Sequence, residues 1–234
     1  MVKPSRPTRT LRTAATLLTL LAVPALAAVV ANCAPAAKPA PAGQPAARAT
    51  SSAARDTAVF AGGCFWSMQT DFEGRPGIVK TTVGYTGGHT VNPSYEDVTT
   101  ETTGHSEAVQ IVFDPARTSY SKLLDLYWHS IDPTQADGQM FDRGSSYMTV
   151  VFYRNEAQHQ AALASKKAIE ALGALKAPIA TEIRPAGPFY RAEEYHQEYG
   201  RKNPVPYGAY RIGSGRDRRI DEVWGKLAAH PEGY

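Results

Sequence analysis

Residues 57–72 read TAVFAGGCFWSMQTDF, an apolar run followed by two glycines, a cysteine and two aromatic residues. Thr57–Ala61 predicts a short buried strand and Phe65–Glu73 predicts a helix. The glycines allow a sharp turn between them, which places Cys64 at the helix N-terminus. Because that end of a helix carries partial positive charge, the sequence predicts an exposed and unusually acidic thiol at Cys64.

Charge is unevenly distributed along the chain. The formal net charge is +3, but residues 1–55 contain seven basic side chains and no acidic one, which leaves 18 basic and 22 acidic residues in the remainder. A mildly acidic domain gives no electrostatic reason to expect nucleic-acid binding. Residues 56–234 are long enough to bury a core, so we predict one catalytic domain there.

Residues 1–33 have the pattern of an export signal or membrane anchor. A basic start ending at Arg12 precedes an uncharged, leucine-rich stretch. Three alternatives stay open: cleavage after Ala27, lipid attachment at Cys33, or an uncleaved anchor. Each places the domain outside the cytoplasm, in the periplasm or tethered on the outer side of the inner membrane. Residues 34–55 are rich in Ala, Pro, Ser and Gly and predict a solvated linker.

The rest of the domain predicts further strands and helices. Strands are expected at 77–85, 107–113, 147–153 and 179–183, and helices at 120–131, 156–172 and 192–199. Ser119 and Asn155 are the expected N-caps of the first two of these helices. This order predicts an α+β fold: a mixed β-sheet with helices packed on one face and a ferredoxin-like βαβ core. Residues 211–219 predict surface coil.

Two long polar segments, 86–105 and 132–146, are candidates for functional loops. Tyr95 and Tyr147 stand in or beside them, where a phenol either donates to a substrate oxygen or simply packs as a half-buried ring. Glu107 follows the first segment. It is either an ordinary edge-strand glutamate or a half-buried acid whose raised pKa lets it donate a proton near neutral pH.

Cys64 is open to more than one interpretation. Most unpaired cysteines are small buried apolar residues, but its strand-to-helix turn and flanking glycines favour a nucleophile. A papain-like cysteine hydrolase would use His105 or His196 as base, although the sequence lacks the histidine and asparagine contexts of that class. A tethered peptide-binding module is the non-enzymatic alternative. The histidines show no ligand spacing with cysteine or carboxylates, so we predict no metal.

A series of motifs, in order along the chain, closely resembles the A-type peptide methionine sulfoxide reductases. The motifs are GCFW at 63–66, GYTGG at 84–88, NPSY at 92–95, GHSE at 104–107, DPT at 132–134, DRG at 142–144, Tyr190, EEYHQ at 193–197 and KNP at 202–204. The resemblance covers the chain from Thr57 to about Tyr207.

The resemblance implies a chemical role for four of these residues. Cys64 would attack the sulfur of methionine sulfoxide and become a sulfenic acid as methionine leaves. Glu107 would protonate the departing oxygen, helped by hydrogen bonds from Tyr95 and Tyr147.

The resemblance also implies how substrate is bound. Phe65 and Trp66 would form an apolar wall for the S-methyl group, which excludes the epimer whose oxygen would point into hydrocarbon and selects the S epimer. Asp142 would orient the backbone amine or amide of the substrate. The implied substrates are free methionine sulfoxide and proteins that contain it.

The chain departs from the common family pattern near its C-terminus. Many members carry one or two late cysteines that resolve the sulfenic acid, but residues 203–208 read NPVPYG and contain none. Residues 139–141 and Met148 also differ from the commoner pattern. We therefore expect no bound cofactor and an external thiol reductant, either a thioredoxin-like protein or glutaredoxin and glutathione. The expected role is repair of oxidised envelope proteins by a monomer.

Overall fold

The computed structural model describes residues 55–231. The predictions for residues 1–33 and for the linker up to Ala54 lie outside the described residues. Helices of the described part are α1 (Phe65–Phe72), α2 (Tyr95–Thr99), α3 (Tyr120–His129), α4 (Glu156–Ala171), α5 (Tyr199–Lys202), α6 (Pro204–Gly213) and α7 (Arg216–Trp224), with short 3₁₀ turns η1 (Ser145–Tyr147), η2 (Glu194–His196) and η3 (Gly225–Leu227).

Six strands form the main sheet in the order β7-β6-β1-β3-β2-β8. Their bounds are β1 (Asp56–Gly62), β2 (Ile78–Thr86), β3 (Ser106–Phe113), β6 (Thr149–Tyr153), β7 (Glu182–Pro185) and β8 (Phe189–Arg191), and β4 (Gly138–Gln139) pairs with β5 (Asp142–Arg143) in a small separate ribbon. The β6–β7 pair is parallel and the other pairs of the main sheet are antiparallel. The mixed sheet of the sequence prediction is confirmed.

The centre of the sheet has ferredoxin-like topology. Strands β1 and β2 are joined through α1, and β3 lies between them, antiparallel to both. The next strand, β6, follows α3 and pairs with the other side of β1. This split βαβ arrangement places the C-terminal end of β1 beside the N-terminal end of β3, because the two neighbouring strands run antiparallel. Cys64 follows β1 and Glu107 lies in β3, so the topology itself brings them close.

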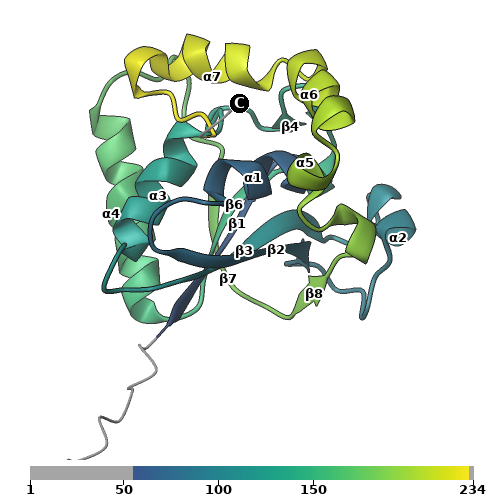
Figure 1. The fold of residues 1–234 in the computed structure, drawn as a ribbon. Helices are drawn as coiled ribbons and strands as arrows, with labels where there is room; N and C mark the ends of the chain where they lie inside the picture. The colour runs from purple at the N-terminus through teal and green to yellow at the C-terminus, as the bar shows by residue number, and fades with distance from the viewer. Residues whose placement is uncertain (1–54, 232–234) are drawn as a thin grey trace, which may run out of the picture. The chain divides into compact units, whose positions relative to one another are not determined.

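The two faces of the sheet are covered differently. On one face, Phe60 of β1 and Ile111 of β3 pack with apolar residues of α1, α3, α4 and α7. The other face packs against Ala186, which lies between β7 and β8, and against Phe189 of β8; its own residues are Val59, Ala61, Ala108, Val150 and Phe152. Figure 1 shows α3 and α4 side by side, and α5 next to α1. Helices on one face agree with the sequence prediction.

Local signals explain most element boundaries. Ser119 accepts a hydrogen bond from the Lys122 amide, and Asn155 accepts one from the Gln158 amide, so both predicted N-caps are confirmed. The expected strand at 147–153 begins only at Thr149, because Tyr147 belongs to η1. The expected strand at 179–183 corresponds to β7, which starts three residues later than predicted. The expected helix at 192–199 is divided between η2 and α5.

The prediction of surface coil at residues 211–219 is wrong. This segment comprises the end of α6 and the start of α7, and Arg211 and Arg216 are both buried. Their charge suggested solvent exposure. The structure instead pairs both with the buried Asp71 of α1, which compensates the cost of burying charge. Among residues 55–231 no helix is both long enough and apolar enough to cross a membrane.

Candidate active site

Cys64 is the N-cap of α1, as the sequence predicts. The preceding residue, Gly63, has φ +82°, in the left-handed region that favours glycine. A Cβ there would lie 2.6 Å from Cβ of Gln139, a side chain that is itself fully buried. The turn that delivers the cysteine to the helix therefore requires glycine at position 63 for both conformation and space.

Gly63→Ala is expected to lower the free energy of unfolding by about 2 kcal/mol, because it combines the strain of a left-handed backbone with a clash between the new Cβ and Cβ of Gln139. Thermal or urea unfolding measures the change. Gly187→Ala is the matched control, since a Cβ there meets open space and the residue has no positive φ. Equal stability of the two variants would contradict this account of the turn.

The thiol differs from the sequence prediction. The sequence predicts an exposed side chain at Cys64, but the residue is only 7% exposed. Burial raises its pKa well above the ordinary value and the charge of Glu107 raises it further, whereas hydrogen bonds from Tyr210 and the Trp66 amide act in the opposite direction. The first free amide of the helix, that of Phe65, donates to Glu107 instead of the sulfur. The expectation of an acidic thiol is therefore wrong.

Glu107 is the acid beside this thiol. It lies in β3 opposite Tyr85 and is 2% exposed. Its Oε2 accepts a hydrogen bond of 2.9 Å from the Phe65 amide. Burial nevertheless raises the pKa of Glu107 to about 8, because this one hydrogen bond does not replace the lost solvation. The carboxyl group therefore carries its proton at neutral pH and can donate it.

An aromatic wall surrounds Cys64, and both predicted wall residues belong to it. Phe65 is buried and Trp66 is half-buried in the cluster that contains Cys64. The Trp66 indole stacks on Tyr199 with ring centroids 3.8 Å apart, and its Nε1 donates to Nδ1 of His196 at 3.1 Å. Burial lowers the pKa of His196, which favours the neutral ring that can accept this bond.

The two predicted tyrosines come from different segments and pack on the same cluster. Tyr95 opens α2, where Oε1 of Glu193 accepts its backbone amide at 2.9 Å. Tyr147 ends η1, which Glu101 holds by accepting hydrogen bonds from Ser145 and Ser146. Burial raises the pKa of Tyr95 to about 12 and raises that of Tyr147 further, so both phenols stay protonated and remain donors.

Asp142, the third predicted binding residue, reaches the cluster through a residue that the sequence analysis missed. Oδ2 of Asp142 accepts a hydrogen bond of 2.6 Å from the Tyr210 hydroxyl. Tyr210 belongs to α6, which the sequence analysis did not predict. Its available signal was Pro204, because proline is favoured in the first turn of a helix. Glu193 and Glu101, which position the two catalytic candidates Tyr95 and Tyr147, were missed as well.

His105 has a structural role. Its Nδ1 accepts the Gly88 amide at 3.1 Å, and its Nε2 lies 2.7 Å from the Thr90 carbonyl oxygen. Both ring nitrogens are therefore used by the backbone of the 86–105 segment. His196 accepts from Trp66 through Nδ1. Neither arrangement resembles a base aimed at a cysteine, which weakens the hydrolase interpretation.

Comparison with known proteins identifies the family of this chain. The family model described as peptide methionine sulfoxide reductase matches residues 56–228. The chain belongs to the peptide methionine sulfoxide reductase family.

Relatives in this family cover nearly the whole described domain. The chain is 56% identical over 172 residues to the peptide methionine sulfoxide reductase MsrA of Bacillus licheniformis, covering 74% of this chain and 95% of that protein. It is 55% identical over 171 residues to the MsrA of Bacillus subtilis, covering 73% and 97%.

Solved structures in the family share the fold. Methionine sulfoxide reductase A of Corynebacterium diphtheriae superimposes with a TM-score of 0.57 at 31% identity, covering 64% of this chain and 76% of that one. Reduced Mxr1 of Saccharomyces cerevisiae superimposes with a TM-score of 0.59 at 31% identity, covering 64% of this chain and 86% of that one.

Within residues 55–231 there is no group of three or more His, Cys, Asp or Glu side chains placed to hold a metal ion.

Proposed function

We propose that this enzyme reduces the S epimer of methionine sulfoxide, free or in proteins, through a sulfenic acid on Cys64. As a family member it is an oxidoreductase that acts on methionine sulfoxide. One observation carries the residue assignment: a buried thiol adjoins a carboxyl group whose pKa is about 8, inside an aromatic cluster. That combination supplies a nucleophile, a proton donor and a water-poor site together.

The proposed reaction transfers one oxygen atom. The Cys64 sulfur attacks the sulfoxide sulfur, while Glu107 protonates the sulfoxide oxygen with Tyr95 and Tyr147 as hydrogen-bond donors to it. The S–S bond made in this attack and the old S–O bond then break as the oxygen passes to the Cys64 sulfur and methionine leaves. Methionine sulfur gains two electrons and the Cys64 thiol becomes a sulfenic acid. The thiol proton restores Glu107, so no net proton is taken up.

The same geometry supports selection of the S epimer. Phe65 and Trp66 would offer apolar surface to the S-methyl group, while the proposed donors would hold the oxygen. In the other epimer the oxygen would meet hydrocarbon, and an unpaired oxygen there costs about 2–4 kcal/mol. Asp142, whose Oδ2 accepts the Tyr210 hydroxyl, would accept a backbone N–H of the substrate.

Regeneration requires thiols from another molecule. Cys64 is the only cysteine between residues 34 and 234. One external thiol would condense with the sulfenic acid, releasing water and forming a mixed disulfide, and a second thiol would displace the Cys64 thiolate. A thioredoxin-like protein, or glutaredoxin with glutathione, has the required chemistry.

The N-terminal sequence supports export. Its basic start and leucine-rich stretch are typical of a signal or anchor, which would place repair of oxidised proteins in the cell envelope. Mass spectrometry of the mature protein isolated from the producing cell would identify its first residue and any lipid on Cys33. A soluble cytoplasmic protein beginning at Met1 would contradict this localisation.

The proposed function predicts a preference of at least about thirtyfold for the S epimer, because the misplaced oxygen costs about 2–4 kcal/mol and each 1.4 kcal/mol is about tenfold. Each separated epimer is incubated in excess over the enzyme without reductant, and methionine release and the mass of the protein are followed. One methionine per enzyme and one added oxygen atom on Cys64 are expected from the S epimer. Equal release from both epimers, or binding without release, would favour a different function.

A further inference from the structure

Helix α6 carries a side chain into the active site that the proposed mechanism does not use. Tyr210 packs on the cluster that contains Cys64, and its ring meets the Trp66 indole edge to face, with centroids 5.8 Å apart and planes at 87°. Its hydroxyl donates to Oδ2 of Asp142 at 2.6 Å. The phenol is therefore fixed at both ends, by an aromatic contact and by a carboxylate.

Tyr210 packs on the same cluster as Cys64, and a hydrogen bond from its hydroxyl acts to lower the pKa of the thiol. A phenol has one proton and two lone pairs. In the resting enzyme it can donate to Asp142 while accepting the thiol proton of Cys64. Once the thiol ionises, rotation about the C–O bond lets the same proton face the sulfur. The hydroxyl would thus serve Cys64 in both protonation states.

We propose that Tyr210 is a further catalytic residue, whose hydroxyl hydrogen-bonds the Cys64 sulfur and stabilises the thiolate that attacks the sulfoxide. This inference rests on the proposed function and extends it. A further donor to sulfur is useful because the Phe65 amide at the start of the helix is already committed to Glu107. Tyr210 and the Trp66 amide are the groups that oppose the effect of burial on the thiol.

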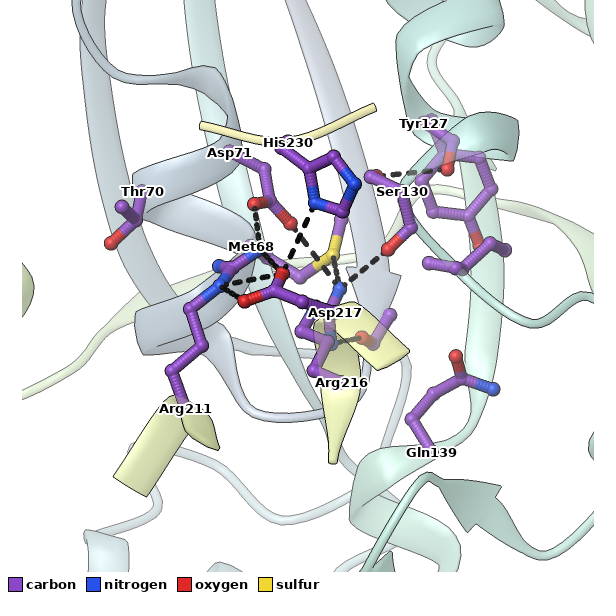
Figure 2. A network of polar contacts seen from close by, with 12 residues as sticks. Met68, Thr70, Asp71, Tyr127, Ser130, Gln139, Arg211, Arg216, Asp217 and His230 are labelled. Atoms are coloured by element: carbon purple, nitrogen blue, oxygen red, sulfur yellow. Dashed lines mark hydrogen bonds and ion pairs between the residues drawn. The ribbon is translucent and has the colours of Figure 1, made fainter. Parts of the chain in front are cut away.

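Arg211 positions Tyr210. The Arg211 guanidinium is buried and forms ion pairs of 2.9 Å with Asp71 and 2.7 Å with Asp217, as Figure 2 shows. Burial alone would lower the pKa of Arg211, but the two carboxylates outweigh it and hold the pKa above its usual value. Asp71 belongs to α1, the helix that Cys64 caps. This clamp therefore fixes α6, and with it Tyr210, to the helix of the nucleophile.

The clamp continues to the turn before Cys64. Arg216, at the start of α7, donates through Nη1 to the Gly62 carbonyl at 3.0 Å and through Nη2 to the Ser130 carbonyl at 2.9 Å. Its Nη2 also lies 3.4 Å from Oδ2 of Asp71. Asp71 is thus shared by Arg211 and Arg216 (Figure 2), and one buried acid ties both the catalytic turn and α6 together.

Tyr210→Phe tests the proposal, because it removes the hydroxyl and keeps the ring. Alkylation of Cys64 by iodoacetamide, without substrate, is expected to slow about tenfold between pH 7 and 10, because less thiolate is present. Methionine release in a single turnover is expected to fall by a similar factor. Tyr153→Phe is the matched control, since Tyr153 lies in β6 and stacks on His159. Alkylation and turnover rates equal to wild type would overturn the proposal.

A double-mutant cycle tests the positioning role of Arg211. Arg211→Lys keeps the positive charge beside Asp71 but loses the planar fork. It is expected to slow alkylation in the wild-type background and to have no further effect in the Tyr210→Phe background. Equal slowing in both backgrounds would show that Arg211 does not act through Tyr210. The alkylation measurements use no sulfoxide, so their outcome is independent of whether the proposed function holds.

Discussion

Cys64→Ser is expected to abolish methionine sulfoxide reduction. A serine hydroxyl is a far weaker nucleophile than a thiol, and oxygen cannot follow sulfur to the sulfenic acid state. The rate of methionine formation is expected to be at least about a thousandfold lower than in wild type. Folding is expected to survive, because serine is close in size to cysteine and is a favoured N-cap for α1.

The measurement is methionine release from the S epimer with a dithiol reductant, together with a thermal melt. Cys33→Ser is the matched control, and it is expected to retain full activity because regeneration uses outside thiols. A Cys64→Ser enzyme with appreciable activity would remove Cys64 from the mechanism. Loss of activity in Cys33→Ser would instead show that Cys33 takes part in regeneration.

Glu107→Gln is expected to slow methionine formation by about a hundredfold to ten-thousandfold at pH 7, the usual contribution of a positioned acid. Glutamine preserves the shape and can still accept the Phe65 amide, but it has no proton to release. The difference is expected to narrow at acidic pH, where solvent acid protonates the sulfoxide without help.

The alkaline side of the profile gives a second test. The pKa of Glu107 is about 8, so the wild-type carboxyl group loses its proton as pH rises through that value. Its negative charge also raises the pKa of the Cys64 thiol, an effect that glutamine lacks. The ratio of wild-type to variant rates is therefore expected to fall above pH 8. Single-turnover rates across pH 5–10 measure it. A ratio independent of pH would exclude Glu107 as the acid.

Local patterns were sufficient for most of the fold. The apolar run before Gly62 predicted β1, and the N-cap residues Ser119 and Asn155 predicted the starts of α3 and α4. These signals depend on neighbours within a few positions, so they can be recognised without knowledge of the tertiary structure. The predicted boundaries were wrong where distant contacts decide them. Tyr147 was expected to start a strand, but it belongs to η1, whose Ser146 amide donates to Glu101.

The C-terminal segment shows why composition alone was misleading. Residues 211–219 contain several arginines, which normally predict solvent exposure. Whether an arginine is buried depends on a partner, and the partner of both Arg211 and Arg216 is Asp71, about 140 residues earlier in the sequence. The segment therefore belongs to two helices that bury Arg211 and Arg216, and the first of them, α6, carries Tyr210 to the active site.

The sequence by itself determined the identity of the nucleophile candidate, its place at the start of a helix, and its isolation from any second cysteine after residue 33. Those properties follow from residue type and order. Only the tertiary structure decided the protonation states, a thiol with a raised pKa beside an acid with a pKa of about 8. The reason is physical: burial is the sum of contacts from segments far apart in the chain, and desolvation outweighs the local field of the helix.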